Sequence, residues 1–325
     1  MRIGLTYDLR SEYLKEGFSE EETAEFDKEE TVFAIEEALG QLKFATDRIG
    51  HVRQLVNRLA QGDRWDMVFN ICEGMYGIGR EAQVPALLDA YRIPYTFSDP
   101  MVLSLTLHKG MTKRVIRDHG IPTPDFAIVE KEKDIFKINL QFPLFVKPYA
   151  EGTGKGIDSA SKVNNPAELE ATCRTLLPKY KLGLIVERYL PGREFTVGIA
   201  GTGENARSLG VMEVMFTKKA EAHGYSYLNK DDYQGRVNYR ILNDSLARNC
   251  EMEALNAWKA LDCRDAGRID LRLDENDVPG FIEVNPLAGL HPIHSDLPII
   301  CKFQGISFVK LIQMIMESAL TRIQT

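Results

Sequence analysis

Two short stretches near the C-terminus decide how this chain is interpreted. Residues 267–273 read Gly-Arg-Ile-Asp-Leu-Arg-Leu, and residues 281–286 read Phe-Ile-Glu-Val-Asn-Pro. Both stretches alternate apolar and polar residues, which is typical of half-buried strands. Residues 274–280 between them are dense in turn-forming residues. The pattern therefore predicts a β-hairpin.

The side-chain alternation of such a hairpin assigns its residues to two faces. The polar face is expected to carry Arg268, Asp270, Arg272, Phe281, Glu283 and Asn285. The core face is expected to carry Ile269, Leu271, Leu273, Ile282 and Val284. If Asp270 lies opposite Glu283, antiparallel register also places Arg268 opposite Asn285. Opposed carboxylates repel unless a cation lies between them, and two carboxylates with an amide oxygen suit magnesium. A solvent-facing hairpin with unconnected charges is the alternative, so the rest of the chain has to decide.

Composition places the chain among ordinary globular proteins. Its 325 residues are 44% hydrophobic and 27% charged, which is enough for two or three domains. The net charge of -7 argues against a nucleic-acid or membrane-surface binder. Five scattered cysteines without CxxC spacing indicate reduced thiols in a cytoplasm, not a disulfide framework or a zinc site.

The first 98 residues alternate predicted strands and helices, which implies a mostly parallel sheet covered on both faces. Strands are expected at 3–7, 44–49, 67–71 and 94–97, and helices at 51–60 and 80–91. A capping box at 19–22 is expected to begin a further helix that ends at Gly40. The glycine-rich residues 73–81 follow a strand, where open α/β sheets bind ligands, but a plain tight loop fits them equally.

The remainder is expected to contain more antiparallel strands. Helices are predicted at 103–119, 166–177, 245–261 and 306–319, and strands at 142–148, 184–190, 194–200 and 209–216. Residues 151–156 carry three glycines, which suit either an anion-binding loop or a hinge without a ligand. Residues 217–238 have no strong periodicity and are interpreted as a long loop, often a lid or binding loop.

In this order the motifs resemble those of the ATP-grasp ligases, and specifically of the D-alanine–D-alanine ligase family. The resemblance is carried by residues 108–109, 146–148, 151–153, 186–190, 192–197, 267–270, 283–285 and 294–298. It implies an α/β (α+β) fold with an open parallel-sheet domain at 1–98, followed by two lobes, 99–189 and 190–325, that enclose ATP. It also implies a cytoplasmic enzyme that uses ATP and two magnesium ions, or Mn²⁺, to form a dipeptide through an acylphosphate.

The resemblance further implies roles for individual residues. Contacts with ATP would come from Lys109, Lys147, Glu151, Gly152, Thr153, Gly154, Glu187, Arg188, Tyr189, Leu190, Glu194 and Lys230. The metal ligands would be Asp270, Glu283 and Asn285. Arg268 would be the catalytic residue that stabilises developing charge, and Ser295 would bind the carboxylate of the second amino acid. The partners would be small amino acids, with a homodimer formed through the N-terminal unit.

Three departures from the family pattern all fall around the amino-acid pockets. No glutamate matches the family's ammonium-binding residue near positions 8–12, no histidine stands in residues 70–77, and Asp231 follows Lys230 in place of a tyrosine. Two other functions therefore stay open: a ligase that joins different amino acids or a hydroxy acid, and a catalytically silent ATP-binding module. Arg268 and Ser295 argue against the silent module.

Overall fold

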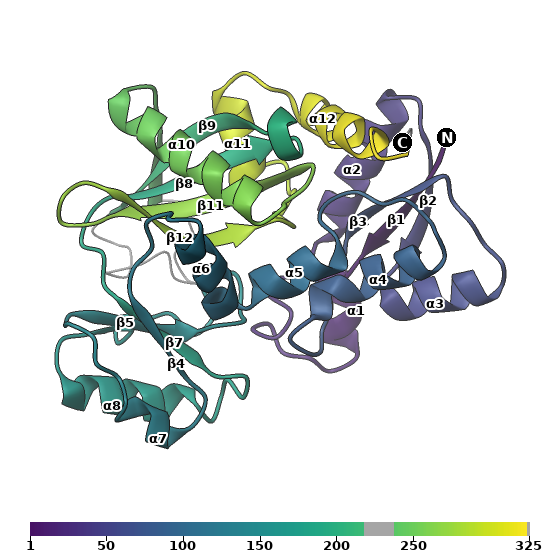
Figure 1. Cartoon of the computed structure of the whole chain (residues 1–325). Coiled ribbons are helices and arrows are strands. Elements are labelled where there is room, and N and C mark those ends of the chain that lie inside the picture. Colours follow the sequence, from purple (N-terminus) through teal and green to yellow (C-terminus); the bar gives the residue numbers. More distant parts are fainter. Residues whose placement is uncertain (218–236, 324–325) are drawn as a thin grey trace.

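The protein forms three sheets, each covered by helices (Figure 1). The computed structural model describes residues 1–217 and 237–323. Its strands are β1 Arg2–Tyr7, β2 Ala45–Gly50, β3 Met67–Ile71, β4 Phe126–Val129, β5 Leu144–Pro148, β6 Lys162–Val163, β7 Leu184–Arg188, β8 Glu194–Ala200, β9 Arg207–Phe216, β10 Val237–Leu242, β11 Ala266–Leu273 and β12 Pro279–Asn285. Its helices are α1 Arg10–Lys15, α2 Glu29–Gln41, α3 Val52–Ala60, α4 Gln83–Ala90, α5 Pro100–Leu107, α6 Lys109–Asp118, α7 Glu132–Ile135, α8 Pro166–Leu176, α10 Ser245–Ala260, α11 Asp296–Phe303 and α12 Phe308–Leu320. Short 3-10 helices cover Arg80–Ala82 and Gly203–Asn205.

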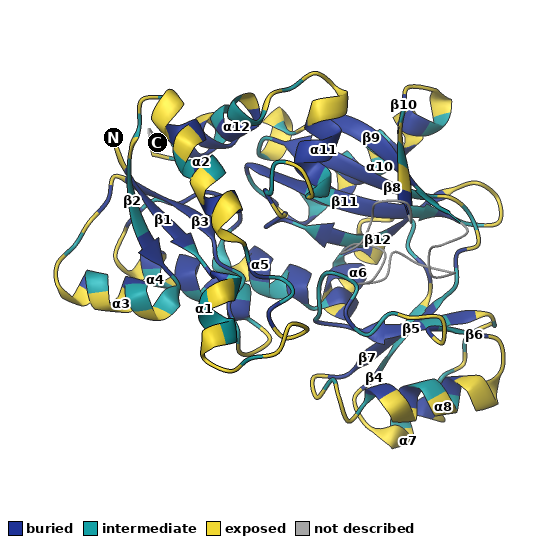
Figure 2. Ribbon diagram, turned by 180° about the vertical axis from the view of Figure 1, so that it is seen from behind, coloured by how far each residue is buried: buried dark blue, intermediate teal, exposed yellow. Residues whose placement is uncertain are grey.

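The N-terminal sheet is parallel, with strand order β2-β1-β3, as its alternating pattern predicts. Apolar side chains of β1 and β3 pack with α2 on one face. Side chains of α3 and α4 cover the other face. Figure 2 shows these strands buried between helices whose outer faces are exposed. The carboxyl ends of the strands therefore open toward the rest of the molecule.

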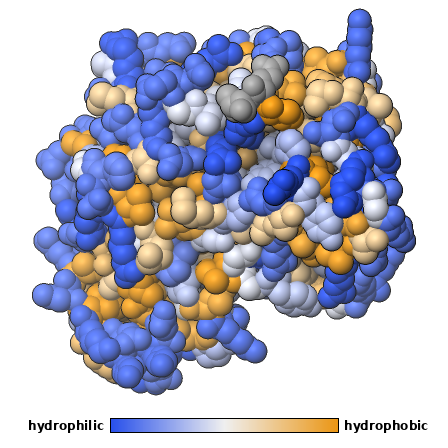
Figure 3. All heavy atoms as spheres, turned by 45° about the vertical axis from the view of Figure 1, so that its right-hand side comes forward, coloured by the Kyte–Doolittle hydropathy of each residue, from blue (hydrophilic) through white to orange (hydrophobic). Residues whose placement is uncertain are grey.

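Two antiparallel sheets form the remainder. The four-stranded sheet has the order β4-β7-β5-β6 and is covered by α7 and α8. The five-stranded sheet has the order β10-β9-β8-β11-β12, with α10 packed on one face and α11 against β8 and β9. The fold class expected from the resemblance is confirmed. Figure 3 shows hydrophilic residues over most of the face that it presents, broken by smaller hydrophobic areas.

The last helix returns to the N-terminal sheet. Figure 1 places α12 beside α2, and their apolar side chains share one core cluster. Among the described residues no single helix is long and apolar enough to cross a membrane. Helices α11 and α12 have the length and apolar composition of a membrane span only when taken together, and a bend of 112° separates them.

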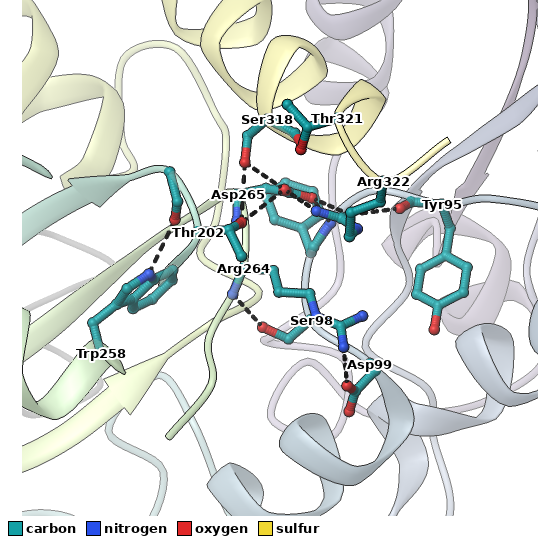
Figure 4. Close-up of polar contacts among 12 residues, drawn as sticks. Tyr95, Ser98, Asp99, Thr202, Trp258, Arg264, Asp265, Ser318, Thr321 and Arg322 are labelled. Atoms are coloured by element: carbon teal, nitrogen blue, oxygen red, sulfur yellow. Dashed lines mark hydrogen bonds and ion pairs between the residues drawn. The ribbon is translucent and has the colours of Figure 1, made fainter. Parts of the chain in front are cut away.

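A buried aspartate, Asp265, connects the N-terminal unit, the five-stranded sheet and the end of α12 (Figure 4). Asp265 is fully buried, and its carboxylate accepts hydrogen bonds from the Phe97 backbone N–H at 2.7 Å and the Ser318 hydroxyl at 2.8 Å. Arg322 donates to the same carboxylate and to the Tyr95 carbonyl, the latter at 3.0 Å. One carboxylate thus connects the N-terminal unit, the five-stranded sheet and the end of α12.

Several predicted elements differ from the structure. The helix expected at 103–119 is two helices, because His108 leaves the helical conformation with ψ of 86°. The helix expected to begin after Ser19 begins only at Glu29, although the Ser19–Glu22 hydrogen bonds do form. Residues 94–97 contribute a single parallel bridge, Val68 to Tyr95, in place of a strand.

The hairpin has the register in which Asp270 lies opposite Glu283, but not entirely the predicted faces. Arg268 pairs with Asn285 and Asp270 with Glu283, after which the register shifts and Leu271 pairs with Phe281. This β-bulge leaves Ile282 as the extra residue on β12. Phe281 consequently faces the core and is 0% exposed, whereas Ile282 lines a cavity. The assignment of Phe281 to the polar face, and of Ile282 to the core, is wrong for that reason.

Candidate functional site

Two adjoining cavities lie where the three sheets meet. The first cavity is lined by Lys109, Pro124, Phe145, Lys147, Pro148, Glu151, Gly154, Lys155, Ile157, Glu187, Arg188, Tyr189, Leu190, Glu194, Asp270, Arg272, Ile282 and Glu283. The second cavity, of about 260 Å³, is lined by Ala24, Glu25, Glu73, Glu81, Thr106, Leu107, Lys109, Glu151, Gly152, Thr153, Arg268, Glu283, Val284, Asn285, Pro286, Leu287, Gly289, His294, Ser295 and Asp296. Lys109, Glu151 and Glu283 line both, so the cavities meet at these three side chains.

A buried ion-pair triad supports the first cavity. The Glu187 carboxylate lies 3.0 Å from the Lys147 ammonium of β5 and 2.8 Å from that of Lys113 on α6. Burial alone raises the pKa of Glu187, but the two lysines outweigh it and lower that pKa overall. Burial lowers the pKa of Lys113 to about 8 although Glu187 opposes the shift. Glu187 therefore holds the cavity's Lys147 in place.

Lys113 was not predicted, although the sequence carries a signal for it. It lies four residues after Lys109 on α6, and residues four apart share one helical face. Its ammonium also donates to the Thr123 hydroxyl at 2.9 Å and the Phe281 carbonyl at 3.0 Å. Lys113 is thus the point at which α6, β7 and β12 meet.

Lys109 joins the hairpin to the glycine-rich loop. Its ammonium donates to the Glu151 carbonyl at 2.7 Å and lies 3.4 Å from the Glu283 carboxylate. The break between α5 and α6 lies at His108, just before Lys109. The His108 ring stacks on the Tyr149 ring, with centroids 4.1 Å apart. Because α6 begins at Lys109, the break directs this side chain to the junction of the two cavities.

The loop at 151–156 adopts left-handed backbone conformations at Thr153, Gly154 and Gly156. A Cβ on Gly156 would lie 2.7 Å from Pro148 and 2.8 Å from Tyr180, so only glycine fits there. The Gly152 N–H donates to the Glu25 carboxylate at 2.6 Å. The loop is thereby attached to the N-terminal unit, and its Glu151, Gly152, Thr153 and Gly154 all line one or both cavities.

The hairpin brings the predicted catalytic and metal residues together. Arg268 pairs with the Asp270 carboxylate and lies 3.7 Å from that of Asp296. Asp270 also accepts from the Thr196 hydroxyl at 2.9 Å. Asp270 borders the first cavity, Arg268 and Asn285 border the second, and Glu283 borders both.

The remaining predicted residues divide between the cavities. Tyr189, Arg188, Leu190 and Glu194 line the first. Arg272, which was predicted on the polar face of the hairpin but not among the ATP contacts, donates to the Tyr189 hydroxyl at 2.8 Å and lies 3.4 Å from the Glu194 carboxylate. Ser295 lines the second cavity, and its hydroxyl accepts from the His291 N–H at 3.0 Å. Lys230 lies outside the described residues.

Three unpredicted glutamates form a wall of the second cavity. Glu25 lies 2.8 Å from the Arg80 guanidinium and 3.6 Å from the Lys155 ammonium. Burial raises the pKa of Glu25, but these cations hold it at about 2. Glu73 and Glu81 flank the glycines after β3, and only their location at a strand's carboxyl end pointed to them.

Comparison with known proteins agrees with this arrangement. Residues 115–317 match the family model described as D-ala D-ala ligase C-terminus. The D-alanine–D-alanine ligase of Bordetella petrii is 31% identical over 278 residues, covering 84% of this chain and 81% of the relative. The Bacillus anthracis D-alanine–D-alanine ligase complexed with ATP superposes with a TM-score of 0.73 at 22% identity, covering 100% and 99% of the two chains. The VanG D-Ala:D-Ser ligase of Enterococcus faecalis gives 0.75 at 19%, covering 98% and 99%. At these identities the two structures show a shared fold.

Proposed function

Because the chain belongs to the D-alanine–D-alanine ligase family, we propose that it joins two amino acids, D-alanine or close relatives, in its second cavity with ATP in its first. As a family member it is an ATP-dependent ligase. One carboxylate takes the γ-phosphoryl group and ADP leaves; the amine of the second amino acid then displaces phosphate and loses a proton as the peptide bond forms. The observation that carries the proposal is the junction of the two cavities at Lys109, Glu151 and Glu283.

The first cavity has the chemistry that a nucleotide requires. Phe145, Tyr189, Leu190 and Ile282 offer an apolar region for a base, and Lys109 and Lys147 provide positive charge for phosphates. Phosphoryl transfer depends mainly on positioning and charge neutralisation. Arg268 would stabilise the charge that develops at the junction, since its guanidinium can contact two oxygens while staying charged.

The hairpin residues fit a magnesium site. Asp270 and Glu283 are opposed, each beside a cation of the chain, and Asn285 lies two residues beyond Glu283 on the same strand. Among the described residues no group of three or more His, Cys, Asp or Glu could hold a metal, and the set proposed here differs by having an amide oxygen as its third ligand. When bound there, Mg²⁺ would neutralise phosphate charge. Asp270, Glu283 and Asn285 would hold it.

The direct test is magnesium-dependent phosphate release from ATP, screened over D- and L-amino acids and D-hydroxy acids. Release with D-alanine alone would support dipeptide formation from two D-alanines. Release only with a different pair would favour the ligase for other amino acids or a hydroxy acid, which the departures near residues 8–12 and 70–77 keep open. No release with any compound would favour the silent ATP-binding module.

A magnesium titration at saturating ATP tests the metal ligands. Glu283→Gln and Asp270→Asn should each raise the magnesium concentration needed for half-maximal activity, because a carboxylate ligand is lost. The matched control is Asp277→Asn in the exposed turn of the same hairpin. Titration curves identical to those of the control would remove these residues from the metal site.

A homodimer and a cytoplasmic location belong to the same proposal. All five cysteines are free and buried, which suits a compartment that keeps thiols reduced.

A further inference from the structure

The second cavity is lined by more carboxyl groups than basic groups. Its lining includes the carboxylates of Glu25, Glu73, Glu81, Glu151, Glu283 and Asp296, but only Lys109 and Arg268 as cations. Four of these carboxylates have a basic partner: Glu25 with Arg80, Glu151 with Lys155, Glu283 with Lys109 and Asp296 with Arg268. Glu73 and Glu81 have no ion pair within residues 1–217 and 237–323.

The two unpaired glutamates are half-buried. Burial raises the pKa of Glu81 to about 7, with Arg80 opposing the shift. Burial, followed by repulsion from Glu81 and Glu25, raises the pKa of Glu73 well above its usual range. Carboxylates that share a partly buried cavity repel each other, and a cationic ligand relieves both the repulsion and the desolvation.

A second observation marks the same cavity as a ligand site. The hydroxyl oxygen of Thr153 and the amide nitrogen of Asn285 are completely buried, yet neither has a hydrogen-bond partner within the described part of the chain. Both residues line the second cavity. Buried polar groups normally have partners, so the lining of this cavity retains hydrogen-bonding capacity that the described residues do not use.

The two glutamates also differ in their distance from the junction with the first cavity. Lys109, at the junction, is close enough to Glu81 to affect its ionisation. The main charged neighbours of Glu73 are Glu81, Glu25, Arg80 and Asp27, which belong to the N-terminal unit. Glu81 also lies on the 3-10 helix Arg80–Ala82, which packs against α5, the helix that leads to Lys109, whereas Glu73 lies between β3 and that 3-10 helix. We therefore take Glu81 as the carboxylate nearer the junction.

We propose that this wall selects an amino acid with two amino groups as the first substrate. Its carboxylate would lie toward Lys109, its α-ammonium at Glu81 and the ammonium of its side chain at Glu73. Two carboxylates without partners match two positive charges, whereas alanine supplies only one. The inference rests on the proposed ligase function and deepens it, because it names the substrate class.

The test uses amino acids matched in length, with and without the second amino group. Phosphate release is measured for 2-aminobutyrate against 2,4-diaminobutyrate and for norvaline against ornithine, as both enantiomers, each paired with itself and with alanine. Mass spectrometry of the dipeptide identifies which amino acid supplied the carboxyl group. We expect kcat/KM at least about tenfold higher for the diamino member of a pair, a factor typical of one well-placed charge contact.

Variants then assign the preference to its residues. Glu73→Gln should abolish the preference for the diamino acid, because kcat/KM falls far more for the diamino member of a pair than for the neutral member. Glu81→Gln should raise KM for both members, because both carry an α-ammonium. The matched control is Glu37→Gln on the exposed face of α2, which should behave as the unaltered enzyme. Glu73→Ala is the second variant if Glu73→Gln does not fold.

The outcomes separate this inference from the proposed function. A preference of the unaltered enzyme for the neutral member of each pair would overturn the inference, as would a diamino preference that survives both Glu73 variants. Absence of phosphate release with every amino acid would count against the ligase function itself.

Discussion

At the residue scale, Arg268 has the most specific predicted role. It is half of a buried pair with Asp270 and lies beside the junction of the cavities. Arg268→Ala should lower kcat by about 100-fold or more, as the loss of one charge-stabilising donor does in other enzymes, with little change in ATP affinity. Arg268→Lys should retain part of the activity that Arg268→Ala loses, because lysine keeps the positive charge but lacks the planar guanidinium that contacts two oxygens.

Single-turnover rates and ATP binding measured on the same preparations separate an effect on catalysis from an effect on ATP affinity. Arg53→Ala, on the exposed side of α3, is the matched control. A variant at Arg268 that turns over as fast as this control would remove the residue from catalysis.

Glu81 should make stability depend on pH. Its folded pKa is raised from 4.5 to about 7, so the folded state retains a proton that the unfolded state releases. The protein therefore loses stability as pH rises from about 4.5 to about 7. Glu81→Gln removes this loss, and its free energy of unfolding should exceed that of the unaltered protein by up to about 3 kcal/mol at pH 8, with little difference at pH 4.5.

Urea unfolding at several pH values measures this difference, with Glu37→Gln as the control. A difference between the two proteins that does not change across that pH interval would contradict the assignment. A gain in stability on replacing Glu81 is expected if this carboxylate serves substrate binding at the expense of folding stability.

At the scale of elements, the bulge in β12 separates two neighbouring residues by function. Phe281 is fully buried in the core, whereas Ile282 faces the first cavity. Phe281→Ala should lower the free energy of unfolding by about 3–5 kcal/mol, because it removes a large core side chain. Ile282→Ala should cost much less stability and should instead weaken ATP binding.

Denaturant unfolding and ATP titration measure these effects. Each variant is the control for the other, because two neighbouring residues are both replaced by alanine. The reverse result, with the larger loss of stability at Ile282, would show that the strand pairs without a bulge.

At the scale of the whole molecule, Asp265 and Arg322 hold the N-terminal unit, the five-stranded sheet and α12 together. Arg322→Ala leaves a fully buried carboxylate with fewer partners, so it should lower the free energy of unfolding by about 3–5 kcal/mol. Arg174→Ala removes only exposed ion pairs on α8 and should cost less than about 1 kcal/mol. Equal losses in thermal or urea unfolding would refute the role of the Arg322 contact.

The order of motifs along the chain was sufficient to predict the family and the ATP-dependent ligation. Local alternation and a turn between two arms predicted the hairpin, which is confirmed, and the structure has the register in which Asp270 lies opposite Glu283. Helix 103–119 was predicted as one element because apolar spacing continues through it. The stacking of His108 on Tyr149, a contact between distant residues, accompanies the break that presents Lys109.

By itself, the sequence determined which chemical groups each element carries, because strand and helix periodicity are local properties. Only the tertiary structure decided which of these groups meet. One extra residue in β12 turned Phe281 to the core and Ile282 to the cavity, the reverse of the predicted faces. The fold also placed Glu187 between two lysines from separate elements. It also brought Glu25, Glu73 and Glu81 to one wall of the second cavity. Burial and charge pairing depend on chain segments far apart in sequence, and those contacts leave no periodic signal.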